Sequence, residues 1–316
     1  MRRSTMSLEF LRSVFGNLDK ITNQSLELLQ MADNDGKVGY ACRQVELKPD
    51  GRLKAFIGEI RESYIGKEKK LDKYQSVCEY DGTTNASTIY RLSTTDALIS
   101  EAYQSLIFAI DHTSQSDDAF VYKSAFIVDG QLTVDIGHCS NPKIKLISMQ
   151  NPVINLNRKF YYHKGEFIEY TNKMLSLKKT IDVLIVGDMT YFFTMAGEKL
   201  FNMERAYKLV CQQKIEEIAL ANIVNAPDQF SVKAKTGHNP RYFVSFNPER
   251  LKALQDRRVR MAIAKQFNIA LDEKGDRFDT TNDKMSEKII KLLCNRGMTD
   301  PFNRIAVEVD GARRWQ

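Results

Sequence analysis

The sequence predicts an α+β protein, with mixed and antiparallel sheets, flanking helices and two subdomains. Short β-prone runs separated by turn residues occupy much of the chain, and apolar residues at helical spacing recur between them. Hydrophobic residues make up 43% of the 316 positions and aromatic residues 10%, as in a packed globular core. This composition argues against a disordered chain.

The first third of the chain alternates helical and β-prone patterns. Apolar side chains at helical spacing over residues 7–31 predict an N-terminal helix that ends at the turn-forming sequence ADNDG. The β-prone runs 37–47 and 52–65 flank a Pro-Asp-Gly turn and predict a β-hairpin. A second helix is expected over residues 96–110.

The best candidate for a linker is the polar, acidic stretch DHTSQSDDA at 111–119, which has almost no apolar residues. We therefore expect an N-terminal α+β region over 1–115 and a C-terminal α+β domain over 119–316.

The C-terminal domain is expected to begin with an antiparallel meander. Asp129-Gly130 predicts a hairpin turn, and Gly187-Asp188 predicts another. The β-prone runs between them lie around residues 143–149, 153–155 and 158–170.

Helices and loops are expected to follow the meander. Asn202 is a good N-cap for a long helix, and residues 225–242, rich in helix breakers, predict a long loop. Asn247 and Pro248 predict the start of a helix that continues to Gln266. A last helix over 282–296 and a strand in RIAVEVDG complete the prediction.

Positive charge is concentrated in one segment of the chain. Residues 233–265 contain nine basic and two acidic residues, a local charge of +7, while the net charge of the whole chain is +6. A local basic surface is typical of proteins that bind polyanions. The alternative is a solvated basic helix that acidic neighbours such as Glu216 and Glu217 balance in the fold.

Three arginines lie almost side by side in the helix expected over 247–266. At 100° per residue, Arg257 and Arg260 lie together opposite the apolar arc, so both are expected to face outward. Arg258 falls inside that arc and is expected to snorkel, to pair with a carboxylate or to line a site at the edge of the core.

Arginine suits phosphate because its planar guanidinium donates two parallel hydrogen bonds and stays protonated. No zinc-finger spacing, basic zipper or clear helix-turn-helix accompanies the arginines, so binding of duplex DNA would be largely independent of sequence. The predicted DNA-binding residues are Arg257, Arg260, Arg258, Lys252, Lys265, Arg250, Arg241, Lys233 and Lys235.

No familiar catalytic signature occurs in the sequence. The nearest is Glu46-Leu-Lys48, which with Asp33 and Asp35 would suit a Mg²⁺-dependent nuclease, although an ordinary hairpin edge is the simpler interpretation. The five cysteines and four histidines show no zinc-binding spacing. We therefore expect a protein that is not an enzyme and has no catalytic residues, metal or cofactor.

The C-terminal two-thirds of the chain contains IDVLIVGDMTYFFTMAGEKLFNMERAYK, a later helix with DRRVRMAIAKQ and a closing RIAVEVDG. With these motifs it resembles KwaB-like proteins of the Kiwa anti-phage defence system. This resemblance implies a cytoplasmic bacterial effector that binds phage DNA and impedes its replication and late gene expression. It also implies recruitment to the inner membrane by a membrane partner, KwaA. The family brings no catalytic residues to this chain.

Two further expectations concern assembly. No apolar run is long enough to cross a membrane, so the chain itself is expected to have no transmembrane segment. A homodimer is expected because symmetric dimers are the commonest soluble assemblies. The alternative to DNA binding is a membrane-peripheral protein whose basic surface meets anionic lipid or acidic loops of its partner.

Overall fold

A computed structural model describes residues 8–34, 37–112, 124–150, 160–169, 177–300 and 305–309. The fold is α+β, as predicted: a mixed eight-stranded sheet is flanked by helices. The chain forms two compact units. Unit 1 comprises residues 1–79 and 86–202, and unit 2 comprises residues 80–85 and 203–316.

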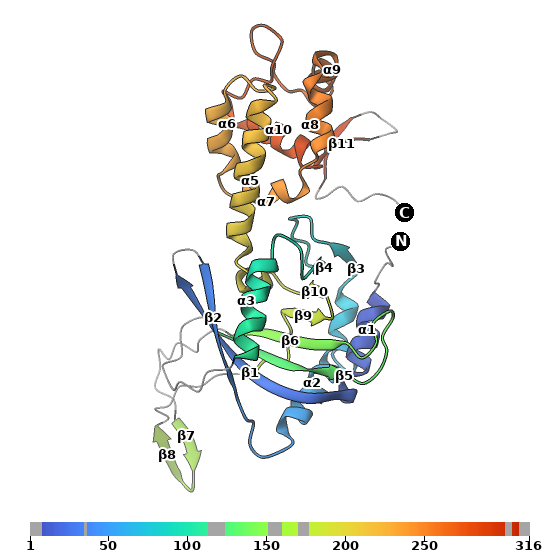
Figure 1. Cartoon of the computed structure of the whole chain (residues 1–316), viewed down its shortest axis with the longest axis vertical. Helices are drawn as coiled ribbons and strands as arrows, with labels where there is room; N and C mark the ends of the chain where they lie inside the picture. The colour runs from blue at the N-terminus through green and yellow to red at the C-terminus, as the bar shows by residue number, and fades with distance from the viewer. Residues whose placement is uncertain are drawn as a thin grey trace. The chain divides into compact units, whose positions relative to one another are not determined.

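The sheet of unit 1 has the strand order β2-β1-β5-β6-β9-β10-β4-β3, and only the pair of β3 and β4 is parallel (Figure 1). Its strands are β1 (Ile21–Asn34), β2 (Lys37–Gln44), β3 (Ser76–Glu79), β4 (Thr88–Ser93), β5 (Ser124–Leu132), β6 (Lys143–Gln150), β9 (Val183–Val186) and β10 (Met189–Phe192). Strands β7 (Phe160–His163) and β8 (Glu166–Glu169) form a separate hairpin. The predicted strand at 153–155 lies outside the described residues.

The core of unit 1 lies between one face of the sheet and two helices. Helices α1 (Leu8–Gly16) and α2 (Arg52–Ile65) bury apolar residues against alternate side chains of the strands, for example Leu26 and Leu28 of β1. Helix α3 (Ser100–Asp111) confirms the helix predicted over 96–110. Tyr103 and Ile107 of α3 line a cavity together with Lys145 and Ile185, which point away from this core.

Two predicted elements near the N-terminus are wrong in part. The helix predicted over 7–31 is confirmed only as α1, which ends at Gly16. Residues 21–34 form strand β1, because the alternation of Leu26 and Leu28 lets this segment pair with both β2 and β5. Residues 52–65 form α2, in which buried Ile57, Ile60 and Tyr64 follow helical spacing, so no hairpin exists there.

Asp129-Gly130 is not a turn, because both residues lie inside the continuous strand β5. A Cβ on Gly130 would lie only 2.4 Å from Cγ2 of Ile21, so the glycine permits close approach of the irregular part of β1. The second predicted turn is confirmed: Gly187, with φ 59°, and Asp188 join β9 to β10.

Strand pairing corrects the domain boundary. Strand β1 pairs with β5, so the segments before and after the predicted linker belong to one sheet. Residues 113–119 of that linker lie outside the described residues, and Asp111 ends α3. The chain instead passes to unit 2 after Asn202, where α5 (Met203–Leu220) begins.

Unit 2 is mainly helical. Besides α5 it contains α6 (Pro227–Ala234), α7 (Asn239–Tyr242), α8 (Pro248–Gln255), α9 (Arg257–Phe267), α10 (Asp283–Leu293) and a hairpin of β11 (Gly297–Thr299) and β12 (Ala306–Glu308) (Figure 1). Residues from most of these helices share one apolar core, which includes Ile218, Phe243, Leu254 and Ile290. The predicted loop over 225–242 is wrong, since it contains α6 and α7.

Short connecting elements complete the described chain. They are α4 (Ala196–Leu200) and the 3₁₀ helices η1 (Leu18–Lys20), η2 (Lys70–Lys73) and η3 (Phe243–Ser245). None of the helices among the described residues is long and apolar enough to span a bilayer.

Candidate nucleic-acid interface

The predicted arginine helix is two helices that meet at Asp256. Asn247 caps α8 as predicted, accepting hydrogen bonds from the backbone N–H groups of Glu249 and Arg250. Asp256 has extended backbone angles (φ −70°, ψ 122°), and its carboxylate accepts a 2.7 Å hydrogen bond from the N–H of Arg258. A new helix therefore starts at Arg257. Its side chains point in directions that differ from those they would have on one continuous helix.

Arg260 is buried, contrary to the prediction that it faces outward. Its side chain is 8% exposed, and Nε donates to the carbonyl of Asp276 at 2.5 Å. Nη1 donates to the carbonyls of Leu254 and Gln255, at 2.5 and 3.2 Å. The guanidinium thus satisfies carbonyls at the end of α8 and in the loop that follows α9, which gives Arg260 a structural role.

Arg258 is exposed, contrary to the prediction that it lies in the apolar arc. On the separate helix α9, buried Arg260 and Ala264 mark the inner side, while Arg258, Met261 and Lys265 share the outer side. Within the described part of the chain, no acidic side chain forms an ion pair with Arg258.

Arg257 is exposed, as predicted, but it has an acidic partner. Its Nε lies 2.6 Å from Oδ1 of Asp276, and both side chains are about half exposed. Such surface ion pairs contribute little to stability and can exchange for another anion.

Three other predicted DNA-binding residues stabilise unit 2. Arg241 donates to the hydroxyl of Tyr80 at 3.0 Å, and its guanidinium lies 5.7 Å from the ring centre of Tyr207. Lys233 is mostly buried and lies 3.7 Å from carboxylate oxygens of α10, contributed by Asp283 and Glu287. The third, Arg250, donates to backbone carbonyls, and burial lowers the pKa of its guanidinium.

The remaining predicted cations, Lys252, Lys265 and Lys235, are exposed. Lys235 follows α6, which lies on the opposite side of unit 2 from α8 and α9 (Figure 1). We define the α8–α9 basic surface as Lys252, Arg257, Arg258 and Lys265. Of the nine predicted DNA-binding residues, these four lie exposed on α8 and α9.

The proposed nuclease motif is an exposed ion pair. Nζ of Lys48 lies 2.9 Å from Glu46 and 3.5 Å from Asp50, and all three side chains are mostly exposed. The side chains of Asp33 and Asp35 lie outside the described residues. The described residues contain no group of three or more His, Cys, Asp or Glu placed to hold a metal ion.

Sequence reasoning missed a polar cavity of about 270 Å³ in unit 1. Buried Lys145 donates to Asp129 at 2.7 Å there, beside Tyr103 and Asp111 of α3. Nearby Glu27 is 4% exposed, and burial raises the pKa of its carboxyl. The sequence contains a signal for this buried charge, because Lys145 interrupts the apolar run KIKLIS.

Comparisons with protein-family models, curated proteins and solved structures find no match to this chain.

Proposed function

We propose that the α8–α9 basic surface binds the phosphates of duplex DNA with little sequence preference. The observation that supports this most directly is the exposure of Lys252, Arg258 and Lys265 without an ion-pair partner among the described residues. A cation that already neutralises a protein carboxylate would lose that partner on binding phosphate, whereas these three would not.

The spacing on α9 suits a backbone contact. Arg258 and Lys265 are seven residues apart, or about 10 Å along the helix axis, at 1.5 Å per residue. Phosphates of one B-DNA strand advance about 3.4 Å per nucleotide along the duplex axis, so the two cations would reach different phosphates. Arg257 would join them by exchanging Asp276 for phosphate.

We place this binding in anti-phage defence because of the KwaB-like sequence pattern. In that setting the protein acts as a cytoplasmic effector, which the membrane partner KwaA recruits to the inner membrane. Occupying phage DNA would impede its replication and late gene expression without requiring catalysis by this chain.

DNA titration of the full chain at low salt tests the proposal. Arg258→Ala/Lys265→Ala should weaken binding of a random-sequence duplex by about a hundredfold or more, since each of the two lost charged contacts contributes roughly 1.5–3 kcal/mol. The matched control is Lys208→Ala/Lys284→Ala, which removes two exposed lysines of unit 2 outside this surface. Equal losses in both double variants, or no binding by the unmodified protein, would refute the assigned surface.

A second candidate function is binding to anionic membranes. Met261 is 45% exposed, on the same side of α9 as Arg258 and Lys265, and Val259 is 38% exposed. Exposed apolar residues among cations are typical of helices that lie at a membrane surface. Binding to phosphatidylserine vesicles, with no binding to duplex DNA, would favour this function over the first.

A further inference from the structure

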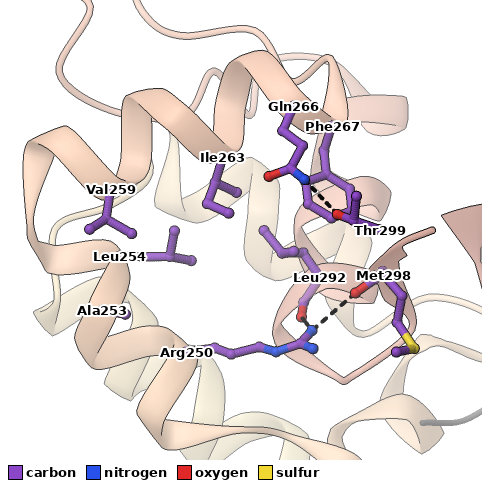
Figure 2. Close-up of a pocket in the computed structure, with 11 residues that line it drawn as sticks. Arg250, Ala253, Leu254, Val259, Ile263, Gln266, Phe267, Leu292, Met298 and Thr299 are labelled. Carbon is purple, nitrogen blue, oxygen red and sulfur yellow. Dashed lines mark hydrogen bonds between the residues drawn. The ribbon is translucent and has the colours of Figure 1, made fainter. Parts of the chain in front are cut away.

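A mainly apolar groove of about 290 Å³ lies beside α8 and α9 in unit 2 (Figure 2). Leu254 of α8 and Val259 and Ile263 of α9 form one side, and Leu292 and Met298 lie across from them. This volume is near the lower end of the range for small-molecule sites, about 300–1,000 Å³.

Polar groups stand at two places in this groove. Nε2 of Gln266 donates to Oγ1 of Thr299 at 2.5 Å, which connects α9 to β11 at one end. Arg250 extends from α8 toward Leu292 and Met298 (Figure 2). A mainly apolar wall with a few polar groups is the usual composition of a small-molecule site.

Arg250 carries a charge that the described protein does not neutralise. Nη1 donates to the carbonyls of Leu292 and Gly297, at 2.6 and 3.3 Å. No carboxylate among the described residues forms an ion pair with this guanidinium. Its Nε and Nη2 atoms donate no hydrogen bond to any described residue. Partial burial already disfavours the charged form and lowers the pKa of Arg250. A bound anion would compensate for this lost solvation.

We propose that this groove binds a small monocarboxylate with an apolar alkyl tail. The carboxylate accepts hydrogen bonds from the guanidinium of Arg250, and the tail lies against Leu254, Ile263 and Leu292. Binding is non-covalent and independent of the DNA contact, because the α9 residues that line the groove include Val259, Ile263 and Gln266 but neither Arg258 nor Lys265.

Titration of the full chain with octanoate tests this site, with 1-octanol as the uncharged probe of the same chain length. Octanoate should bind with an affinity at least about tenfold above that of octanol, because only the carboxylate makes charge-assisted hydrogen bonds. Equal affinity for the two probes, or no detectable binding of octanoate by calorimetry, would overturn the proposal.

Two variants locate the site. Ala253 is exposed and lines the groove, so Ala253→Trp should fill the groove and abolish octanoate binding without disturbing the core. Arg250→Gln should remove the preference for octanoate over octanol, with thermal melting used to check that the variant folds. Unchanged octanoate binding by Ala253→Trp would contradict this location even if Arg250→Gln did not fold.

Discussion

Arg260 shows how a basic residue can be misassigned to a binding surface. Its guanidinium donates to three backbone carbonyls, those of Leu254, Gln255 and Asp276. Removing the donor leaves these carbonyls without that partner in a buried environment, which is costly. Arg257, three residues away, is exposed, and its side chain makes a surface ion pair with Asp276. The two arginines therefore provide a matched pair for mutation.

Arg260→Ala should lower the free energy of unfolding by about 2–4 kcal/mol, since hydrogen bonds from charged groups contribute roughly 1.5–3 kcal/mol and the packing of the side chain is lost too. Arg257→Ala should cost no more than about 1 kcal/mol. Urea unfolding followed by circular dichroism measures both changes. The sequence-based assignment of Arg260 to DNA would be restored if Arg260→Ala kept full stability and lost DNA affinity.

Glu27 is a second residue whose burial has a measurable consequence. Its Oε2 atom has no hydrogen-bond partner among the residues that the structure describes, and desolvation raises the pKa of the carboxyl against the opposing effect of the Ser25 hydrogen bond. The folded protein therefore holds this proton to higher pH than the unfolded chain does. The contribution of the protonated Glu27 carboxyl to the free energy of unfolding is fully present below the unfolded pKa and is lost as pH rises through the folded pKa.

Glu27→Gln should remove this loss, so the variant should be more stable than the unmodified protein at neutral pH and similar to it near pH 4. Each unit by which the pKa is raised corresponds to about 1.4 kcal/mol. Thermal melting at a series of pH values measures the difference, and Glu46→Gln, at an exposed carboxylate, is the control. A stability difference that did not change with pH would contradict the assignment.

At the scale of elements, local signals predicted some helix ends but missed the break between α8 and α9. Asn247 and Pro248 marked the start of α8 because capping depends on neighbouring residues alone. Asp256 is also a common N-cap residue, yet the apolar pattern on both sides of it is compatible with one continuous helix. Treating the two helices as one gave the wrong directions for the side chains of α9. Arg260 was therefore expected to face outward and Arg258 to lie in the apolar arc, which is the reverse of what the structure shows.

Asp256→Ala tests the importance of this cap. Loss of the hydrogen bond from the N–H of Arg258 should destabilise unit 2 by about 1 kcal/mol, whereas Asp256→Asn should keep most of the stability. Urea unfolding of both variants provides the measurement. If Asp256→Ala and Asp256→Asn were equally stable, the cap would not account for the start of α9.

At the scale of the whole molecule, strand order and domain division depended on contacts between distant residues. The meander of β5, β6, β9 and β10 was predictable in outline because these strands are consecutive neighbours in the sheet. The pairing of β1 with β5 joins segments about a hundred residues apart, and no local pattern specifies it. The polar stretch at 111–119 therefore suggested a domain boundary inside what is one unit.

The salt dependence of DNA binding tests the charge distribution of the whole chain. If all nine cations of residues 233–265 contacted phosphate, log K would fall with log[salt] at a slope of about −8, at 0.9 per contact. Among the described residues, Lys252, Arg258 and Lys265 are exposed and form no ion pair. Arg257 can exchange its carboxylate partner for phosphate. We therefore expect a slope of about −3 to −4. Titrations of the full chain at several salt concentrations measure this slope, and Arg258→Ala/Lys265→Ala should reduce its magnitude by about 2. A slope near −8 would require Arg260 and Arg250 to be released on binding, which their hydrogen bonds to backbone carbonyls oppose.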